Sequence, residues 1–411
     1  MPRKERLSTV VRTLQVSVDC PWPPISGGDI RNAFLARCVG GLGPVLTLCL
    51  GKANQDSAPE GVTVEQLPGF LDKNPWHQRN KDVRTSIAIG QSDLDYLEAA
   101  ITRFRPDIAI LEGVYVKEAL PVFKKSGLPV ILDMHNIESD LFLAIRRQLP
   151  WRRRIKDILL GERQWRQLRE TDRTVSLSVD ETWVVSQHDQ DRLRQIGGSS
   201  GQIVVNPVPD ERMYELPIDE ARYQNPEVLF IGHLGYAPNV SAVLELASKI
   251  WPLVLAGQPG ASLSIMGRSP ARAIEGLEAE AGISIVGNPA DLIGPARRHG
   301  YTLLPIRSGG GTRLKALEAM AAGLVVIATA KAVEGLGLEP DQHYLRAEAP
   351  QDFVRMLLAG CQRPAEMALL ADRARAYVRN GFGSETLVSL ICERVRALTH
   401  RRNNARDQHE A

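Results

Sequence analysis

The sequence has little of what marks secreted, membrane-spanning or zinc-binding proteins. It holds five cysteines in 411 residues, a scattered set without a Cys-x-x-Cys pair, which disfavours both a disulfide framework and a zinc site. No apolar run reaches the ~18 residues that a membrane-spanning helix needs. The charged start MPRKERLS is not followed by the apolar segment of a secretory signal. We therefore expect a cytoplasmic protein.

The chain also lacks an excess of charge of either sign. Lys and Arg number 50 against 48 Asp and Glu, a formal net charge of +2, which argues against nucleic acid as a partner. Residues 146–173, however, hold ten Lys or Arg and only four Asp or Glu, interleaved with apolar side chains such as Trp151 and Trp165. Such a surface suits an anionic acceptor or peripheral contact with the inner face of a membrane. A solvated helix that packs its apolar residues inward is the favoured interpretation.

Short β-branched runs alternate with helical patterns, which predicts an α/β fold of parallel βαβ units. The expected strands form two sets, Leu14–Val18, Val45–Leu50, Asp107–Leu111 and Pro129–Met134, then Glu227–Ile231, Ser262–Met266, Ile283–Val286, Thr302–Pro305 and Leu324–Ala328. The proline-rich stretch between the sets is typical of an inter-domain linker. We expect domains at 10–207 and 226–383, a linker at 208–225, a C-terminal helix at 384–400 and a disordered tail at 401–411.

A glycine-rich loop that opens a helix carries the strongest chemical signal. Three consecutive glycines, Gly309, Gly310 and Gly311, follow a predicted strand, and Thr312 is expected to cap the next helix. Backbone N–H groups of such a loop and the positive end of the helix attract an anion. The spacing does not fit a P-loop, because no Lys directly follows the last glycine.

Charged residues at the start of this helix point to the same ligand. Arg313 and Lys315 oppose the helix dipole, and a bound phosphate or diphosphate reverses that penalty. Glu318 lies at the edge of the apolar stripe of the helix, where a buried carboxylate needs hydrogen-bond donors. Two ribose hydroxyls or a structural Arg satisfy that need equally well.

The first domain has a weaker version of the same arrangement. Gly28 follows the first strand, but the spacing is not Gly-x-Gly-x-x-Gly, so a nicotinamide fingerprint is not supported. His135 follows another strand at the sheet edge where α/β proteins bind ligands, although a hydrogen-bonded structural histidine is the favoured interpretation. Glu112, which ends a further strand, can share that rim, with a loop acid in water as the favoured alternative.

These residues together resemble a known family. The run from Arg307 to Gly323, with GGGTRLKALEAMAAG at its centre, resembles the donor-site signature of retaining, family-four (group 1) glycosyltransferases of the GT-B type. The stretches SGGDIRN, LDMHNIES, ETWVVSQHD and FIGHLGYAPNVSAV support it in the expected order. The resemblance spans roughly residues 14–395 and implies an α/β fold of two Rossmann-like, doubly wound domains that face a cleft.

The resemblance also implies roles for individual residues. Glu318 matches the glutamate that holds the donor ribose, and Arg313 and Lys315 look like the cations that neutralise the diphosphate. His135 matches the histidine that contacts the transferred sugar, so His135, Arg313 and Lys315 are the expected catalytic residues. The other expected donor-binding residues are Gly28, Gly267, Arg268, Asn288, Gly309, Gly310, Gly311 and Thr312, and the acceptor-side candidates are Glu112 and Tyr115.

One departure from the family pattern bears on activity. The family's first glutamate, eight positions before Glu318, is replaced by Gly310. The implied function is transfer of a sugar, with retention and without a metal or other cofactor, from a nucleotide-diphosphate sugar to a glycan, lipid-linked or small-molecule hydroxyl. A hexosyltransferase-like enzyme of polysaccharide, glycolipid or glycoconjugate biosynthesis fits this description. A non-catalytic GT-B subunit, an epimerase or a phosphorylase is the alternative.

Overall fold

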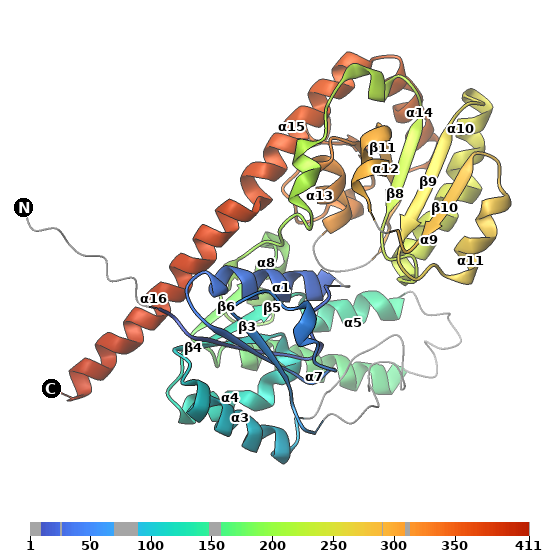
Figure 1. Cartoon of the computed structure of the whole chain (residues 1–411). Coiled ribbons are helices and arrows are strands. Elements are labelled where there is room, and N and C mark those ends of the chain that lie inside the picture. The colour runs from blue at the N-terminus through green and yellow to red at the C-terminus, as the bar shows by residue number, and fades with distance from the viewer. Residues whose placement is uncertain are drawn as a thin grey trace, which may run out of the picture. The chain divides into compact units, whose positions relative to one another are not determined.

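The computed structural model describes residues 10–24, 27–69, 89–147, 158–289, 291–308 and 313–410, which form two compact units. Unit 1 comprises Met1–Val205 and Leu387–Ala411, and unit 2 comprises Asn206–Thr386. Each unit contains a parallel β-sheet with helices packed against it (Figure 1). Unit 2 is therefore an insertion between two parts of unit 1.

The sheet of unit 1 is parallel, with the order β3-β2-β1-β4-β5-β6-β7. Its strands are β1 Thr13–Ser17, β2 Val45–Cys49, β3 Val62–Gln66, β4 Ile108–Glu112, β5 Val130–Met134, β6 Glu181–Val184 and β7 Gln202–Ile203. The central strands are buried on both faces, as their continuous apolar runs predict. The order reverses between β1 and β4, and the crevice at such a switch point is where doubly wound folds bind ligands.

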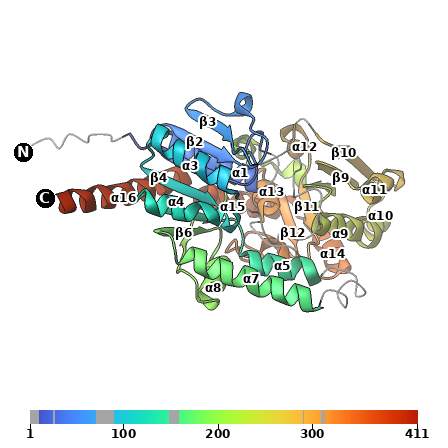
Figure 2. The ribbon, with the colours of Figure 1, turned by 90° about the horizontal axis from the view of Figure 1, so that it is seen from below.

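Helices cover both faces of this sheet. They are α1 Gly27–Gly40, α3 Gln91–Phe104, α4 Leu120–Lys125, α5 Glu138–Arg147, α7 Ile158–Ser176, α8 Gln187–Gln195 and α16 Ser384–Glu410. One apolar core joins residues of α3 and α4 to one face, and a second joins α1 and α16 to the other. α5 and α7 pack side by side, as both views of the molecule show (Figures 1 and 2).

Helix α16 returns the chain to unit 1 and completes its second core. Leu387, Ile391, Val395 and Leu398 are buried there, in the same cluster as Ala33 and Leu35 of α1. The helix runs on through residues 401–410, so the expectation of a disordered tail is wrong over that range. Composition misled us here, because a polar stretch without apolar anchors is equally typical of a solvated helix extension.

The sheet of unit 2 is parallel as well, with the order β10-β9-β8-β11-β12-β13 and its switch point between β8 and β11. Its strands are β8 Glu227–Ile231, β9 Ser262–Gly267, β10 Ile283–Gly287, β11 Tyr301–Leu304, β12 Val325–Ala328 and β13 Leu345–Arg346. Its helices are α9 Ala237–Glu245, α10 Trp251–Gly257, α11 Arg272–Glu275, α12 Ile293–Arg298, α13 Leu314–Ala321, α14 Pro350–Cys361 and α15 Pro364–Phe382.

The predicted linker is part of unit 2. Short 3₁₀ turns at Glu211–Glu215 and Glu220–Tyr223 bury Met213 and Tyr223. Arg222, also buried, donates to the carbonyl oxygens of Pro217, Ala296, His299 and Ala322. The linker prediction is therefore wrong, because the prolines suggested an exposed connection while an arginine supplied an anchor that hydropathy does not register.

The helical stretch Ala237–Gly257 is the one in the described residues that is long and apolar enough to cross a membrane, with a hydropathy of 1.4. It consists of α9, a π-helical turn at Leu246–Ile250, and α10. Val243, Leu246 and Trp251 are completely or almost completely buried in unit 2. Packing inside the unit accounts for its apolar composition.

We expect the α16 contact to stabilise unit 1 strongly. Ile391→Ala removes a side chain with 0% exposure and is expected to lower the free energy of unfolding by ~2–5 kcal/mol. Val388→Ala, on the same helix at 36% exposure, is the matched control and is expected to cost well under half as much. Urea unfolding of the full chain measures both, and equal losses contradict the packing described here.

Candidate functional site

The switch point of unit 2 gathers basic side chains from three segments. His233 follows β8, Arg268 follows β9, and Arg313 and Lys315 open α13 after β11. Burial lowers the pKa of His233, and the nearby charges of Lys315 and Arg268 lower it further. Three loops that are far apart in sequence thus bring basic side chains to one edge of the sheet. Among them, Arg313 and Lys315 are the two that the sequence predicts for a phosphate ligand.

Arg313 lies at the N-cap of α13 and is 9% exposed. Its Nη2 is 3.2 Å from Oε2 of Glu334, which also pairs with Nζ of Lys331. The predicted N-cap, Thr312, is wrong, because the helix begins one residue later than a threonine cap requires. Thr312 itself and the loop of Gly309, Gly310 and Gly311 lie outside the described residues.

Lys315 packs its aliphatic stem against the loop that follows β8. A Cβ on Gly232 would lie 2.5 Å from Cε of Lys315, so the lysine occupies the space that this glycine leaves. Gly267 in turn packs on Gly232, since its Cβ would lie 1.6 Å from the Gly232 carbonyl oxygen. Burial lowers the pKa of Lys315 to about 8. With a pKa this close to neutral pH, a nearby anion shifts the lysine toward its charged form.

Glu318 lies one helical turn after Lys315 and is partly buried. Burial raises its pKa to about 7, and the charge of Lys315 offsets only part of that effect. Among the described residues, no side chain donates a hydrogen bond to its carboxylate, so the structural Arg that the sequence left open is not found there. A carboxylate in this state favours a ligand that brings hydroxyl donors.

The turns after β9 and β10 are tied to one another. Oδ1 of Asn288 accepts a hydrogen bond of 3.1 Å from the backbone N–H of Ser269, and the N–H of Asn288 donates to the Gly267 carbonyl. Asn288 has a left-handed φ of 52°, which asparagine tolerates better than most residues. Gly267 and Asn288 therefore shape this edge of the sheet, and Arg268 lies exposed between them. Their contact with a nucleobase stays a prediction.

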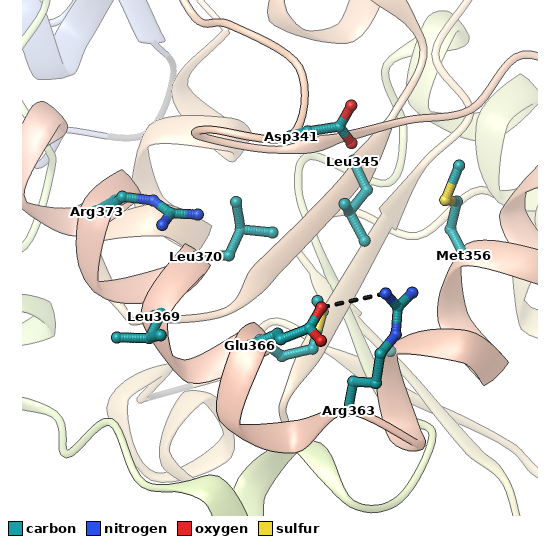
Figure 3. A pocket seen from close by; sticks show the side chains of 10 residues that line it. Asp341, Leu345, Met356, Arg363, Glu366, Leu369, Leu370 and Arg373 are labelled. Atoms are coloured by element: carbon teal, nitrogen blue, oxygen red, sulfur yellow. Dashed lines mark hydrogen bonds and ion pairs between the residues drawn. The ribbon is translucent and has the colours of Figure 1, made fainter.

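Unit 2 has a hollow of about 370 Å³ beside α14 and α15 (Figure 3). Leu345, Met356 and Leu370 supply apolar side chains, and an ion pair of 3.1 Å joins Arg363 to Glu366 at its edge. None of the predicted site residues lines this hollow.

In unit 1, a buried ion pair stands beside the predicted His135. Nη2 of Arg31, on α1, lies 2.5 Å from Oδ1 of Asp133, and Nε lies 2.6 Å from Oδ2, with both residues fully buried. Nη1 of Arg31 donates to the Val204 carbonyl. Burial opposes ionisation of Asp133, but the charge and hydrogen bonds of Arg31 outweigh it and hold the pKa of Asp133 below its usual range.

His135 contacts two carboxylates through one ring nitrogen. Its Nε2 lies 3.3 Å from Oε2 of Glu112 and 3.3 Å from Oδ2 of Asp133. Burial alone lowers the pKa of His135, but the hydrogen bonds and charges of Asp133 and Glu112 outweigh it and raise the pKa to about 9. Glu112, Asp133 and His135 have the spacing of a metal-ligand group. Because Arg31 already engages both oxygens of Asp133, the geometry favours contact of His135 with the two carboxylates over a bound metal ion.

Asn32 connects this network to Gly28. With its amide turned so that nitrogen faces the acceptors, Asn32 brings that nitrogen to 3.2 Å from the Gly28 carbonyl oxygen, 2.9 Å from Oε2 of Glu112 and 2.8 Å from Nε2 of His135. Gly28 lies in the first turn of α1, where backbone N–H groups have no partner inside the helix. The structure thus brings Gly28, Glu112 and His135 together, as their positions at the ends of β1, β4 and β5 predict.

The two acceptor-side candidates have different surroundings. Glu112 is buried beneath His135, so the expectation of a loop acid in water is wrong: the end of β4 lies between neighbouring strands. Burial raises the pKa of Glu112, and its contact with His135 opposes the shift. Tyr115 is partly exposed, and its hydroxyl donates to Glu138 at 2.7 Å. A role of Tyr115 toward an acceptor stays a prediction.

The basic stretch is only partly described, because residues 148–157 lie outside the described part of the chain. On α7, Arg166 pairs with Glu162 at 3.0 Å and Arg173 with Glu170 at 2.6 Å. Asp172 faces the other way, accepting a hydrogen bond from the N–H of Ser139 at the start of α5. These contacts fit the favoured solvated helix, and contact with a membrane stays a prediction.

Sequence reasoning missed the residues that surround the predicted site residues. Arg31, Asn32, His233 and Glu334 were not singled out. The one available signal was position, since all four follow strands at the edges that bind ligands. Nothing in residue type alone separates them from ordinary surface charges.

The fold matches solved GT-B glycosyltransferases over almost the whole chain, which confirms the predicted fold class. HepE from Anabaena, solved in complex with UDP, is 14% identical with a TM-score of 0.65, and the match covers 94% of this chain and 100% of HepE. A sucrose-phosphate synthase from Thermosynechococcus elongatus is 17% identical with a TM-score of 0.67, over 95% and 100% of the two chains. Both units have the parallel-sheet α/β architecture of this fold.

The sequence of unit 2 matches the model of a known family. Residues 225–362 match the family described as glycosyl transferases group 1, a range that includes Arg313, Lys315 and Glu318. An uncharacterized 44.6 kDa protein in the cps region of Klebsiella pneumoniae is 20% identical over 398 residues, 93% of this chain and 99% of that protein. The predicted resemblance to group 1 glycosyltransferases is supported at this level.

We expect the Arg31–Asp133 pair to stabilise unit 1 only as a pair. Arg31→Met leaves a buried carboxylate without its cation and is expected to cost ~3–5 kcal/mol of unfolding free energy. The double variant Arg31→Met, Asp133→Leu removes both charges and is expected to regain most of that loss. Urea unfolding of the single and double variants tests this, and an Arg31→Met variant as stable as the wild type contradicts it.

Proposed function

We propose that this protein is a glycosyltransferase that moves a sugar from a nucleotide-diphosphate sugar to a hydroxyl acceptor. The observation that supports this most directly is helix α13, which carries Arg313, Lys315 and Glu318 at the switch point of a unit whose sequence matches group 1 glycosyltransferases. HepE was solved with UDP, which makes a uridine nucleotide the first donor to test.

The chemistry follows from what each group of α13 offers. Departure of the diphosphate from the anomeric carbon leaves negative charge on phosphate oxygens, and preorganised cations lower the barrier by stabilising that charge. Arg313, Lys315 and the start of α13 supply the positive charge for this stabilisation. Glu318 accepts hydrogen bonds from the two ribose hydroxyls, which relieves the cost of its burial.

We further propose retention of the anomeric configuration and a mechanism without a metal ion. Retention rests on the resemblance to the retaining family, and we assign no protein nucleophile. Metal independence is supported by the cations of α13, which take the place of a metal at the diphosphate, and by Arg31, which engages the carboxylate of Asp133. His135 is proposed to contact the transferred sugar.

The acceptor is proposed to be a glycan, a lipid-linked glycan or a small molecule in polysaccharide, glycolipid or glycoconjugate biosynthesis. The relative in the cps region of Klebsiella supports the polysaccharide assignment. A cytoplasmic location, with peripheral contact at the inner face of the membrane, completes the proposal. Thermal-shift screening with nucleoside diphosphates and their sugars tests it, because a ligand that binds the folded state raises its stability by mass action. The absence of a thermal shift with uridine, guanosine, thymidine and adenosine donors favours a non-catalytic GT-B subunit.

The ribose assignment of Glu318 predicts a specific loss of affinity. Glu318→Ala is expected to weaken binding of the nucleotide sugar at least ~tenfold, about 1.4 kcal/mol, with the fold intact. Glu278→Ala, an exposed carboxylate of the same unit, is the matched control and is expected to leave affinity unchanged. Isothermal titration with the donor found by screening measures both. Wild-type affinity in a folded Glu318→Ala variant removes the assignment.

The lowered pKa of Lys315 predicts that donor binding depends on pH. The free site holds its pKa at about 8, and a bound diphosphate favours the charged ammonium. Affinity is therefore expected to fall as pH rises through 8, approaching a tenfold loss per pH unit until the raised pKa of the bound lysine is reached. Lys315→Met is expected to bind more weakly and to lose this dependence. Titration of the nucleoside diphosphate above pH 7.5 checks it, and a flat wild-type profile contradicts the role of Lys315.

A further inference from the structure

The central strand of unit 1 has a polar side where an apolar one is expected. In β1, Leu14 and Val16 join one apolar core. Thr13, Gln15 and Ser17 alternate with them, are also buried, and by the period of a strand point to the opposite face. Central strands of parallel sheets are usually apolar on both faces. Burying a polar side chain is costly unless it is hydrogen-bonded.

Gln15 makes hydrogen bonds to two neighbouring strands and to α1. Its Oε1 accepts from Oγ1 of Thr47 on β2 at 2.9 Å. Its Nε2 donates to Oε1 of Glu112 on β4 at 2.6 Å and to the Asn32 carbonyl at 3.0 Å. All the hydrogen-bonding groups of the Gln15 amide except one lone pair are therefore used, so the amide has one orientation.

Glu112 passes this orientation to His135. One carboxylate oxygen, Oε1, is held by Gln15, and the other, Oε2, lies 3.3 Å from Nε2 of His135, with the turned amide nitrogen of Asn32 close to both atoms. The chain Thr47, Gln15, Glu112 and His135 thus crosses β2, β1 and β4 and ends just after β5, following the order of the sheet. Hydrogen bonds in a buried chain of this kind fix one another.

Of the four described residues in this hydrogen-bonded series, only His135 reaches the surface. The His135 side chain is 23% exposed, whereas that of Glu112 is fully buried. Since Nε2 is engaged by the two carboxylates, the ring presents Nδ1 and its adjoining edge away from them. A fixed Nδ1–H is a hydrogen-bond donor for a hydroxyl or phosphate oxygen of a ligand.

We propose that Thr47, Gln15 and Glu112 are positioning residues, which orient His135 so that its Nδ1 edge is held away from the carboxylates, ready to donate to a hydroxyl or phosphate oxygen of a substrate. This inference rests on the proposed glycosyl transfer and adds to it a group of residues that touch no substrate themselves. It also gives the buried Glu112 a role that differs from contact with an acceptor.

A purely structural role does not explain why Thr47, Gln15 and Glu112 are buried together. Apolar side chains of similar volume in place of a buried polar group are often neutral or stabilising, so stability alone does not account for a glutamine here. The Arg31–Asp133 pair is complete without Gln15 and already joins α1 to β5. The charged groups that face His135 are Glu112 and Asp133, with Arg31 behind Asp133, and of these only Glu112 is held by the chain.

Two variants separate orientation from charge. Gln15→Met keeps the volume and removes the donor to Glu112, and Glu112→Gln keeps the shape and removes the charge next to His135. Thr13→Val is the matched control, because Oγ1 of Thr13 is buried on the same face of β1 and makes no hydrogen bond within the described residues. Thr47→Val is the reserve variant if Glu112→Gln does not fold.

The first measurement needs no substrate. Side-chain nitrogen NMR of the nucleotide-free protein follows the titration of His135, assigned among the eight histidines by its loss in His135→Gln. The pKa of about 9 is expected to fall by at least ~1 unit in Glu112→Gln, because the carboxylate that raises it is gone, and to stay unchanged in Thr13→Val. An unchanged titration in Glu112→Gln overturns the inference, whatever the activity.

The second measurement uses the donor identified by screening. In both Gln15→Met and Glu112→Gln, kcat is expected to fall at least ~tenfold while the KM for the donor changes less than ~threefold, because neither substituted residue is proposed to bind the donor nucleotide. Thr13→Val is expected to keep both values. Wild-type kcat in folded variants overturns the positioning role and leaves glycosyl transfer standing. A wild-type protein that transfers no sugar overturns the proposed function and the positioning role with it, while the NMR titration still judges the network.

Discussion

The ion pair between Arg31 and Asp133 is the contact on which the arrangement of unit 1 depends. It joins the helix after the first strand to the fifth strand, and a third N–H of the same guanidinium binds the carbonyl of Val204, next to the point where the chain leaves the unit. A charge pair this deeply buried holds its elements together only while both members are present. The positions of Gly28 and His135 depend on this ion pair, because each residue lies within three positions of Arg31 or Asp133.

In unit 2, close packing rather than an ion pair holds the loops at the sheet edge. The close approach of Gly267, Gly232 and Lys315 leaves no room for a side chain at either glycine, so three loops meet at one edge of the sheet. The cations of α13 then lie in a partly buried setting, where their charge acts more strongly than it does in water. Both units thus place polar groups at the switch points of their sheets, one by an ion pair and the other by contact.

The architecture could be predicted from the sequence because it depends on patterns that are local. Apolar runs and intervening helical periods located β8 correctly at Glu227–Ile231 and the other expected strands to within one or two residues. The residues of α13 were found because glycine, cation and carboxylate spacing is a local signal too. The partners were not, since Gln15 with Glu112, or Arg31 with Asp133, are about a hundred positions apart. The linker failed for the same reason, because the carbonyl groups that hold Arg222 come from distant segments.

The return of α16 to unit 1 has a consequence for the order in which the chain acquires its structure. Unit 2 is continuous in sequence, so it can fold as soon as residues 206–386 have been synthesised. Unit 1 begins first and finishes last: the core that α1 forms with one face of its sheet is incomplete until residues 387–398 leave the ribosome. Throughout the synthesis of unit 2, the uncovered part of that core is open to chaperones and to other chains.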